Sequence, residues 1–122
     1  DAYLTSMKPV PSPYLEKGKL TRSARRGEKV FDKAGCARCH SGPYLTDQKQ
    51  HNVGLGLGRH EDTAFDTPSL VEIWRTAPYL YDGRAATMEE VLTTYNTGDT
   101  HGRTSGLSAK ELEDLSTFIL SQ

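Results

Sequence analysis

Apolar and small residues recur with the spacing of one helix face between residues 22 and 33. The pattern predicts a first long helix there, capped at its start by Thr21 or Ser23. The residues of this face are Ala24, Gly27, Val30, Phe31 and Ala34. Because the face includes a glycine, a second helix could approach it closely at that position.

A second long helix is predicted near the other end of the sequence. Ser108 and Glu111 have the spacing of a capping box, and the helix should run from there to about Leu120. Its inner face would consist of Leu112, Leu115, Phe118 and Ile119. We expect the two long helices to cross at Gly27, with Phe31 packed beside the contact.

In the middle of the chain, the sequence pattern predicts two shorter helices separated by loops. A Thr-Pro pair supplies the N-cap and the first-turn proline for a helix over residues 69–74. A Thr-x-x-Glu capping box opens a helix over residues 88–95. Residues 41–66 are interpreted as loop, and their GLGLG run follows no hydrophobic strand, which argues against a dinucleotide-binding turn. The predicted fold class is all-α.

The first twenty residues differ from the rest. Three prolines at alternate positions favour extended backbone over residues 9–13. The opening residues 1–7 resemble residues 116–122, since in both an aromatic residue is followed by an aliphatic one and then by serine. We interpret residues 1–20 as a linker or as the tail of a preceding domain, and residues 21–122 as one domain.

The strongest motif is the CxxCH run formed by Cys36, Cys39 and His40. Two thiols at this spacing can each add to one vinyl group of a porphyrin, and the adjacent histidine can then bind the iron as its proximal ligand. The motif accounts for both cysteines of the chain. It predicts one covalently attached c-type haem.

Two other interpretations of the cysteine pair fit the sequence less well. A structural zinc site needs four nitrogen or sulfur ligands, and no second CxxC exists to complete one with His51, His60 or His101. A thioredoxin-like dithiol normally follows a strand, and no strand-rich pattern precedes Cys36. Haem attachment is therefore the leading hypothesis.

Composition agrees with a haem domain. The chain has 122 residues and only 35% hydrophobic residues, so a buried macrocycle would supply apolar surface that the side chains lack. No apolar run approaches the roughly 20 residues that a membrane-spanning helix needs. No signal peptide is recognisable, and because the chain starts at Asp1 it is interpreted as mature, processed or excised.

Charge is unevenly distributed along the chain. Residues 1–40 hold nine Lys or Arg against four Asp or Glu, whereas residues 41–122 hold six against twelve. The basic part contains the CxxCH run and could steer an acidic redox partner toward the haem edge, although a solvated helix face would give the same pattern. A near-neutral pI, with aromatic residues not interleaved among the basic ones, argues against nucleic-acid binding.

Three ordered blocks carry a family resemblance beyond the CxxCH run. They are residues 65–70 (FDTPSL), 76–83 (TAPYLYDG) and 86–91 (ATMEEV). With a helix before the CxxCH run and a terminal helix packing back on it, the chain resembles class I cytochrome c. More specifically, it resembles the C-terminal haem domain of bacterial di-haem cytochrome c peroxidases and MauG-like proteins. The resemblance implies a cytochrome c-like fold around one haem.

The chain also departs from that family. The family arginine after the Pro-x-Leu is Val71 here, and Arg75, one helical turn later, could take over a haem propionate. The family histidine before the Asp-Gly turn is Tyr81. Only one CxxCH run is present, whereas the peroxidases use two haems. The resemblance therefore implies a partner haem domain before residue 1 if the chain takes part in such a cycle.

The sixth iron ligand is the main open question of the sequence. His101 is the leading candidate, because it follows the predicted distal helix in a loop that could fold over the iron. Tyr95 stands where the family resemblance places the distal methionine or tyrosine, and Met88 is a chemically natural ligand. An open sixth position is the further alternative, and it would admit peroxide or a gas.

Other residues are predicted to surround the cofactor. Trp74 and Tyr79 are expected in the pocket wall, and Arg75 and Arg84 are candidates to bind the propionates. His51 and His60 are expected in surface loops, although the resemblance of residues 51–54 to a family loop would let His51 bond a propionate.

The sequence thus predicts one-electron transfer by a covalent haem c. The alternative is the haem domain of a peroxidase-like enzyme that reduces hydrogen peroxide with a second haem domain. A third reading is an interaction module in which the haem is mainly structural and residues 1–20 make head-to-tail contacts. Because bacteria attach c-type haem on the periplasmic side, we expect a periplasmic or extracellular location.

Overall fold

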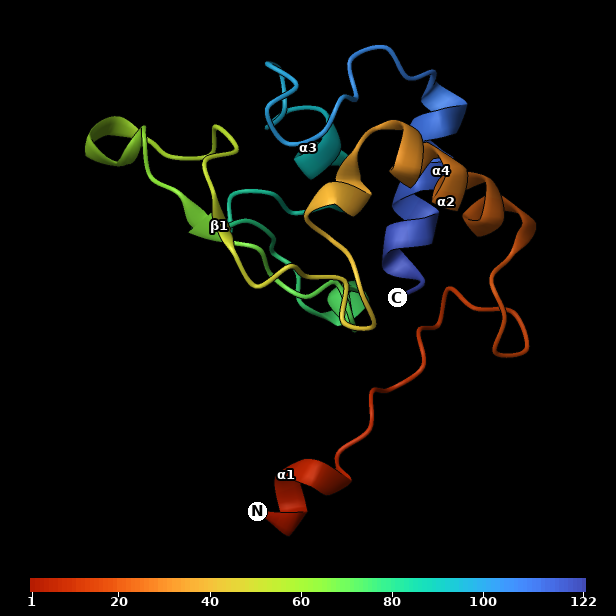
Figure 1. Cartoon of the computed structure of the whole chain (residues 1–122). Helices are drawn as coiled ribbons and strands as arrows, with labels where there is room; N and C mark the ends of the chain where they lie inside the picture. The colour runs from red at the N-terminus through yellow and green to blue at the C-terminus, as the bar shows by residue number, and fades with distance from the viewer.

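The computed structural model describes residues 1–122, and its long helices lie near the two ends of the chain. Figure 1 shows α2 and α4 crossing in the body of the molecule, with α3 and the long loops to one side and α1 standing apart. The α-helices are α1 (Ala2–Ser6), α2 (Arg22–Lys33), α3 (Met88–Leu92) and α4 (Ala109–Leu120). The shorter elements are the 3₁₀ helices η1 (Cys36–Arg38), η2 (Gly58–His60) and η3 (Ile73–Arg75) and the strands β1 (Gln50–His51) and β2 (Phe65–Asp66).

The crossing of α2 and α4 is as close as the sequence predicts. A Cβ atom placed on Gly27 would lie 1.9 Å from the carbonyl oxygen of Asp114 and 2.7 Å from Cβ of Phe118. The rings of Phe31 and Phe118 pack edge to face beside this point, with centroids 5.2 Å apart. The predicted start of each helix is also confirmed, because Thr21 caps α2 and the Ser108–Glu111 capping box opens α4.

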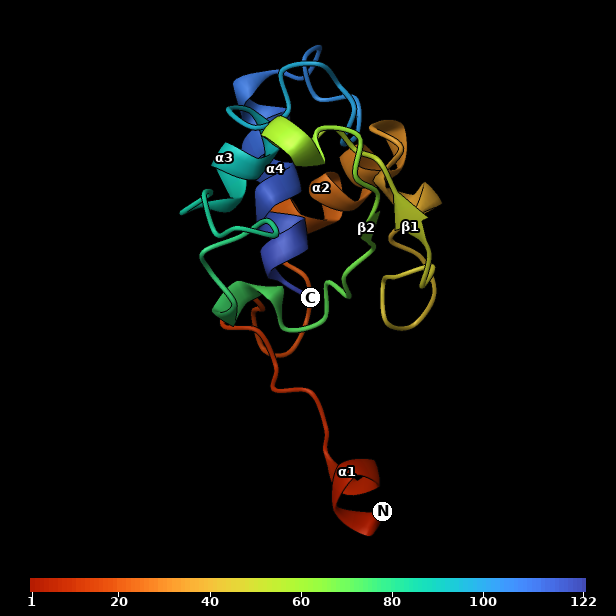
Figure 2. The same cartoon turned by 90° about the vertical axis from the view of Figure 1, so that its left-hand side faces the viewer.

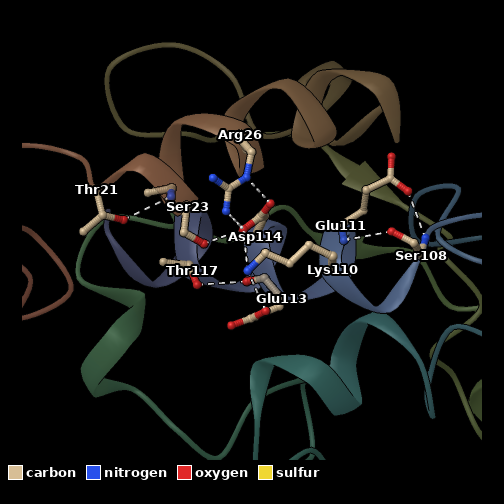
Figure 3. A network of polar contacts seen from close by, with 10 residues as sticks. Thr21, Ser23, Arg26, Ser108, Lys110, Glu111, Glu113, Asp114 and Thr117 are labelled. Carbon is tan, nitrogen blue, oxygen red and sulfur yellow. Dashed lines mark hydrogen bonds and ion pairs between the residues drawn. The ribbon is translucent and has the colours of Figure 1, made fainter.

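A buried carboxylate fixes the two helices along one edge of their contact, shown in Figure 3. Asp114 on α4 accepts two hydrogen bonds from the guanidinium of Arg26, at 2.6 and 2.8 Å, and a third from the Ser23 hydroxyl. These donors favour the charged form and hold the pKa of Asp114 well below its usual range. Lys33 and Glu111 form a more exposed pair at 2.7 Å.

The core lies where α2, α3 and α4 meet. Leu115 is fully buried, and side chains from α3 pack against it together with Phe118 and Ile119 of α4. Leu70, just before η3, and Tyr79 and Ala85, between η3 and α3, extend this cluster. One continuous core therefore joins the two ends of the domain to its middle.

Two predicted helices differ in the structure. The helix expected over residues 69–74 is replaced by the single turn η3, because Glu72 takes a left-handed backbone conformation with φ of 62°. Ser69 also turns its hydroxyl to the carbonyl of Tyr44, outside its own segment. The helix expected over residues 88–95 ends at Leu92, where Thr93 leaves the helical region and bonds back to Glu89.

The expectation of an all-α fold needs one correction. β1 and β2 form a two-stranded antiparallel sheet in which Gln50 pairs with Asp66 and His51 with Phe65. Strands of two residues are too short to produce a recognisable alternation of polar and apolar positions, so the sequence pattern does not predict them.

Residues 1–14 form an arm that extends from the body of the molecule, with α1 at its far end, as both Figure 1 and Figure 2 show. α1 has no buried residue, and Tyr3, Leu4 and Met7 are exposed. The arm joins the body through the amide of Val10, which donates to Glu72, and the hydroxyl of Ser12, which donates to the carbonyl of Leu120. None of the helices combines the length and apolar character needed to cross a membrane.

Candidate haem site

A cavity of about 680 Å³ opens beside the CxxCH run. Its wall is built from the end of α2 and the cysteine loop, the strand region, the segment 76–81, α3 and the loop 99–103. Its size is in the range of pockets that bind cofactors. Most of the wall surface is apolar, which suits a flat hydrophobic ring.

The local backbone presents the two cysteines to this cavity. Gly35 ends α2 in the left-handed conformation with φ of 84°, and the chain then makes the single turn η1. Cys36 and Cys39 both line the cavity and form no disulfide. Burial raises the pKa of the Cys36 thiol to about 11, so it is protonated near neutral pH. This disfavours a reactive dithiol.

His40 is oriented by a hydrogen bond within its own loop. Its Nδ1 lies 3.1 Å from the carbonyl oxygen of Leu45, and its ring lines the cavity. Burial lowers the pKa of His40, so the ring is neutral and Nδ1–H donates to the carbonyl. The lone pair then remains on Nε2, which is the arrangement that metal-binding histidines usually show.

His101 reaches the same cavity from the loop that follows α3. The centroids of the His40 and His101 rings lie 6.4 Å apart. Two imidazoles that bind one metal from opposite sides at about 2.0–2.1 Å have centroids roughly 6–6.5 Å apart. Nδ1 of His101 is buried without a hydrogen-bond partner, and burial lowers the pKa of this ring to about 4. His101 is therefore a neutral, unpartnered imidazole beside the motif histidine.

The other two candidate ligands are placed differently. Met88 lines the cavity, but it is only 7% exposed and belongs to the hydrophobic core at the start of α3. Tyr95 does not line the cavity; its ring centroid lies 5.4 Å from the guanidinium carbon of Arg84. The ligand role of each of these residues stays a prediction, and His101 has the geometry that suits it best.

Of the residues that were expected to surround the haem, only some line the cavity. Tyr79 is buried and lines the cavity. Trp74, Arg75 and Arg84 are not among the residues that line the cavity. Arg75 pairs with Glu72 at 2.8 Å, and Arg84 donates to the carbonyl of Leu55. Their roles toward the cofactor stay predictions.

Buried polar atoms without partners gather in the predicted site residues. Four side-chain atoms of the chain are buried without a hydrogen bond, and they include Nε1 of Trp74 and Nδ1 of His101. Nε of Arg84 is a third, although it lies 3.3 Å from Oδ1 of Asp82 in an ion pair. Each can donate a hydrogen bond, and a buried donor without an acceptor is costly. The acidic groups of a haem are acceptors that could satisfy a donor such as Nε1 of Trp74.

His51 and His60, both expected in surface loops, have different surroundings, and His51 is a partly buried residue of β1 that pairs with Phe65. His51 lines the cavity and bonds Asp47 at 2.7 Å, and this contact lowers the pKa of Asp47 to about 2. Cys39 completes a small cluster with this pair, but the haem motif already assigns that thiol. His60 is exposed on η2, outside the cavity.

Sequence reasoning missed other features of the cavity. The rings of Phe65 and Tyr81 stack with centroids 4.5 Å apart, and both line the wall. Arg38 and Arg103 are exposed residues that also line it. The position of Arg38 inside the CxxCH run could have indicated its place, whereas Arg103 comes near only through the fold.

Comparison with known proteins agrees with this geometry. The family model of the cytochrome c-550 domain matches residues 13–122. The chain belongs to the cytochrome c-550 domain family. It is accordingly a haem c domain, and its thiol pair, oriented imidazole and apolar cavity fit a covalently bound haem.

Individual relatives of the chain include a cytochrome-c peroxidase and MauG. The cytochrome-c peroxidase of Denitromonas iodatirespirans is 30% identical over 156 aligned positions, which cover 85% of this chain and 41% of that protein. The methylamine utilization protein MauG of Methylorubrum extorquens is 39% identical over 89 positions, or 62% of this chain and 25% of that protein. The resemblance to peroxidases and MauG-like proteins is thus confirmed.

A solved structure shows the same fold over nearly the whole chain. A chain of hydrazine synthase from Kuenenia stuttgartiensis superposes with a TM-score of 0.85 at 28% identity, covering 98% of this chain and 52% of that chain. The chain therefore spans only about half, or less, of the proteins it resembles.

Proposed function

We propose that this domain transfers single electrons through one covalent haem c, whose iron His40 and His101 would bind. The observation that carries the proposal is the pair of neutral imidazoles, 6.4 Å apart, on the wall of the cavity that Cys36 and Cys39 also line. The bound haem supplies a metal centre that takes up and releases one electron.

The residues of the chain have separate tasks in this proposal. Cys36 and Cys39 anchor the ring through thioether bonds, and η1 fixes their spacing. The Leu45 carbonyl holds His40 in one tautomer, which makes Nε2 the binding atom. Apolar residues such as Leu70, Ile73 and Tyr79 exclude water from the cavity. A second histidine in place of methionine would lower the reduction potential.

The ligand assignment is tested by replacing His101 with alanine. We expect the ferric wild-type domain to be low-spin and to lack the long-wavelength band of methionine ligation. H101A should become high-spin and should bind added imidazole, because the sixth position is then open. Absorption and electron paramagnetic resonance spectra measure both changes. Y95F and M88L serve as matched controls and should keep the wild-type spectrum; loss of the low-spin signal in M88L alone would overturn the assignment.

A second candidate function is a peroxidase-like haem domain that works with another haem domain. It is favoured by the similarity to a cytochrome-c peroxidase and to MauG, of which the chain spans 41% and 25%. In this reading the arm of residues 1–14 leads to the second domain. A high-spin ferric spectrum in the wild-type domain, together with reduction of added hydrogen peroxide, would favour this candidate over electron transfer.

We further propose that the domain works in the periplasm or outside the cell. The support is the chemistry of the attachment, since bacterial c-type haem is joined to CxxCH runs on that side of the membrane. The redox partner is proposed to be a protein, and residues Arg22, Arg25 and Lys29 offer an exposed basic surface on α2.

A further inference from the structure

One buried side chain clamps the loop that carries His101. Asn96 follows α3 and is only 3% exposed. Its Oδ1 accepts from the amide of His101 at 2.9 Å, and its Nδ2 donates to the carbonyl of Gly102 at 2.8 Å. The two bonds hold the amide of His101 itself and the carbonyl of the residue that follows it.

The orientation of the Asn96 amide follows from its partners. A backbone amide can only donate and a backbone carbonyl can only accept, so Oδ1 and Nδ2 cannot be exchanged. Nδ2 donates its second hydrogen bond to Oγ1 of Thr104, at 2.8 Å. The hydroxyl of Thr104 in turn donates to the carbonyl of Leu92, at 2.7 Å. Both hydrogens of the amide are used, and the chain of bonds ends on the last residue of α3.

The loop is tied to the rest of the cavity on two further sides. The amide of Arg103 donates to the carbonyl of Ala34, which joins the loop to the end of α2. On the other side Thr100 packs on Gly54, where an added Cβ would lie 2.5 Å from the threonine hydroxyl. In contrast to its backbone, the imidazole of His101 makes no hydrogen bond to the protein.

We infer that Asn96 is a positioning residue, which holds His101 in place for binding the haem iron. The inference rests on the proposed ligand role of His101. A loop usually runs over the surface, and a buried polar network is costly unless every member is paired. Here every polar group of the network is paired, while the ring that the network carries stays free at the cavity wall. A ligand fixed in this way binds without loss of loop entropy.

The test compares N96A with the wild-type haem protein. The substitution removes all three bonds of the amide, so His101 should bind the iron less firmly. We expect a partly high-spin ferric spectrum and an affinity for added imidazole that rises by about tenfold or more. T104V, which keeps the shape of threonine but removes its hydroxyl, should show a smaller change in the same direction.

A control separates positioning from general stability. S23A removes a hydrogen bond to the buried Asp114, far from the loop, and should lower the melting temperature without changing the spectrum or the imidazole affinity. If N96A is too unstable to purify, N96D takes its place. The aspartate keeps the acceptor for the His101 amide but loses the donor to Gly102, so it should also raise the imidazole affinity.

The two proposals fail in different ways. If H101A changes the spectrum but N96A or N96D retains the wild-type spectrum and imidazole affinity, the positioning role is overturned and the ligand assignment stands. If H101A itself leaves the spectrum unchanged, the ligand assignment falls, and the inference about Asn96 falls with it.

Discussion

Glycine residues determine how closely parts of this domain can approach each other. Gly27 is the clearest case, because the carbonyl oxygen of Asp114 occupies the space that a Cβ would need. The contact is with backbone, which cannot move aside as a flexible side chain can. The position therefore controls the distance between the two long helices.

Replacing Gly27 with alanine should destabilise the domain. Although alanine favours a helix by about 1 kcal/mol over glycine, the clash with Asp114 should lower the free energy of unfolding by at least about 2 kcal/mol. Thermal unfolding followed by circular dichroism measures the effect. G106A is the matched control, because nothing lies within 4 Å of its added Cβ. Equal stability of the two variants would contradict the close crossing.

The residues of the site differ in how far the sequence reveals them. Cys36, Cys39 and His40 are local in the chain, so their spacing predicts their chemistry. His101 is recognised as a candidate ligand only through its place after the distal helix. Asn96 could not be predicted, because its partners are a loop turn and a threonine whose positions depend on the folded backbone.

At the scale of elements, α2 and α4 form a pair joined by both apolar and charged contacts. The buried carboxylate of Asp114 takes its donors from α2, while Glu111 pairs with Lys33 one turn earlier along α4. Both contacts lower the pKa of the carboxyl group, to about 2 for Glu111. The attachment of α4 to α2 therefore depends on ionised acids.

Acid should weaken this helix pair. A carboxyl whose pKa is lower in the folded state stabilises the protein above its unfolded pKa of about 4. That contribution is lost as the pH falls from about 4 toward 2. Urea unfolding at a series of pH values should show stability declining in this window. A stability that stays constant down to pH 2 would contradict the role of these carboxylates.

The substitution D114N should change how the unfolding free energy depends on pH in the same range. At pH 7 this variant should lose about 2 kcal/mol of unfolding free energy, a moderate figure because Arg26 remains partly hydrated. Below pH 3 the difference from the wild type should shrink. E113Q is the control, since Glu113 forms only an exposed pair with Lys110 and should change stability by less than about 0.5 kcal/mol.

Elements with strong local signals were predicted well, and elements held by distant contacts were not. Caps and apolar faces define α2 and α4 in the sequence itself. In contrast, Ser69 bonds to the distant Tyr44 and Glu72 adopts a left-handed conformation, so the expected helix over 69–74 does not form. The pairing of β1 with β2 likewise depends on the fold and not on local preference.

At the scale of the whole molecule, the arm and the body are separate parts. Residues 1–8 bury nothing on the body, whereas Val10 and Ser12 attach the arm to Glu72, just before η3, and to the end of α4. The basic character expected for the first forty residues is also reduced by the fold. Arg26 and Lys33 are paired with acids of α4, which leaves fewer basic groups free for a partner.

Removing residues 1–8 should leave the haem domain intact. We expect an unchanged melting temperature and an unchanged ferric spectrum, because no core or cavity contact is lost. Removing residues 1–14 should lower the melting temperature, since the bonds of Val10 and Ser12 then disappear. Spectral change in the shorter deletion would indicate that α1 acts on the haem site.

The contact between α2 and α4 also determines when the chain can fold. The two helices are separated by some 75 residues of sequence, and their pairing requires closure of that whole segment. Until residues 109–120 pair with it, α2 has no partner for its apolar face. The middle of the domain, including the CxxCH run that follows α2, is therefore held in its final place only when the two ends of the chain have met.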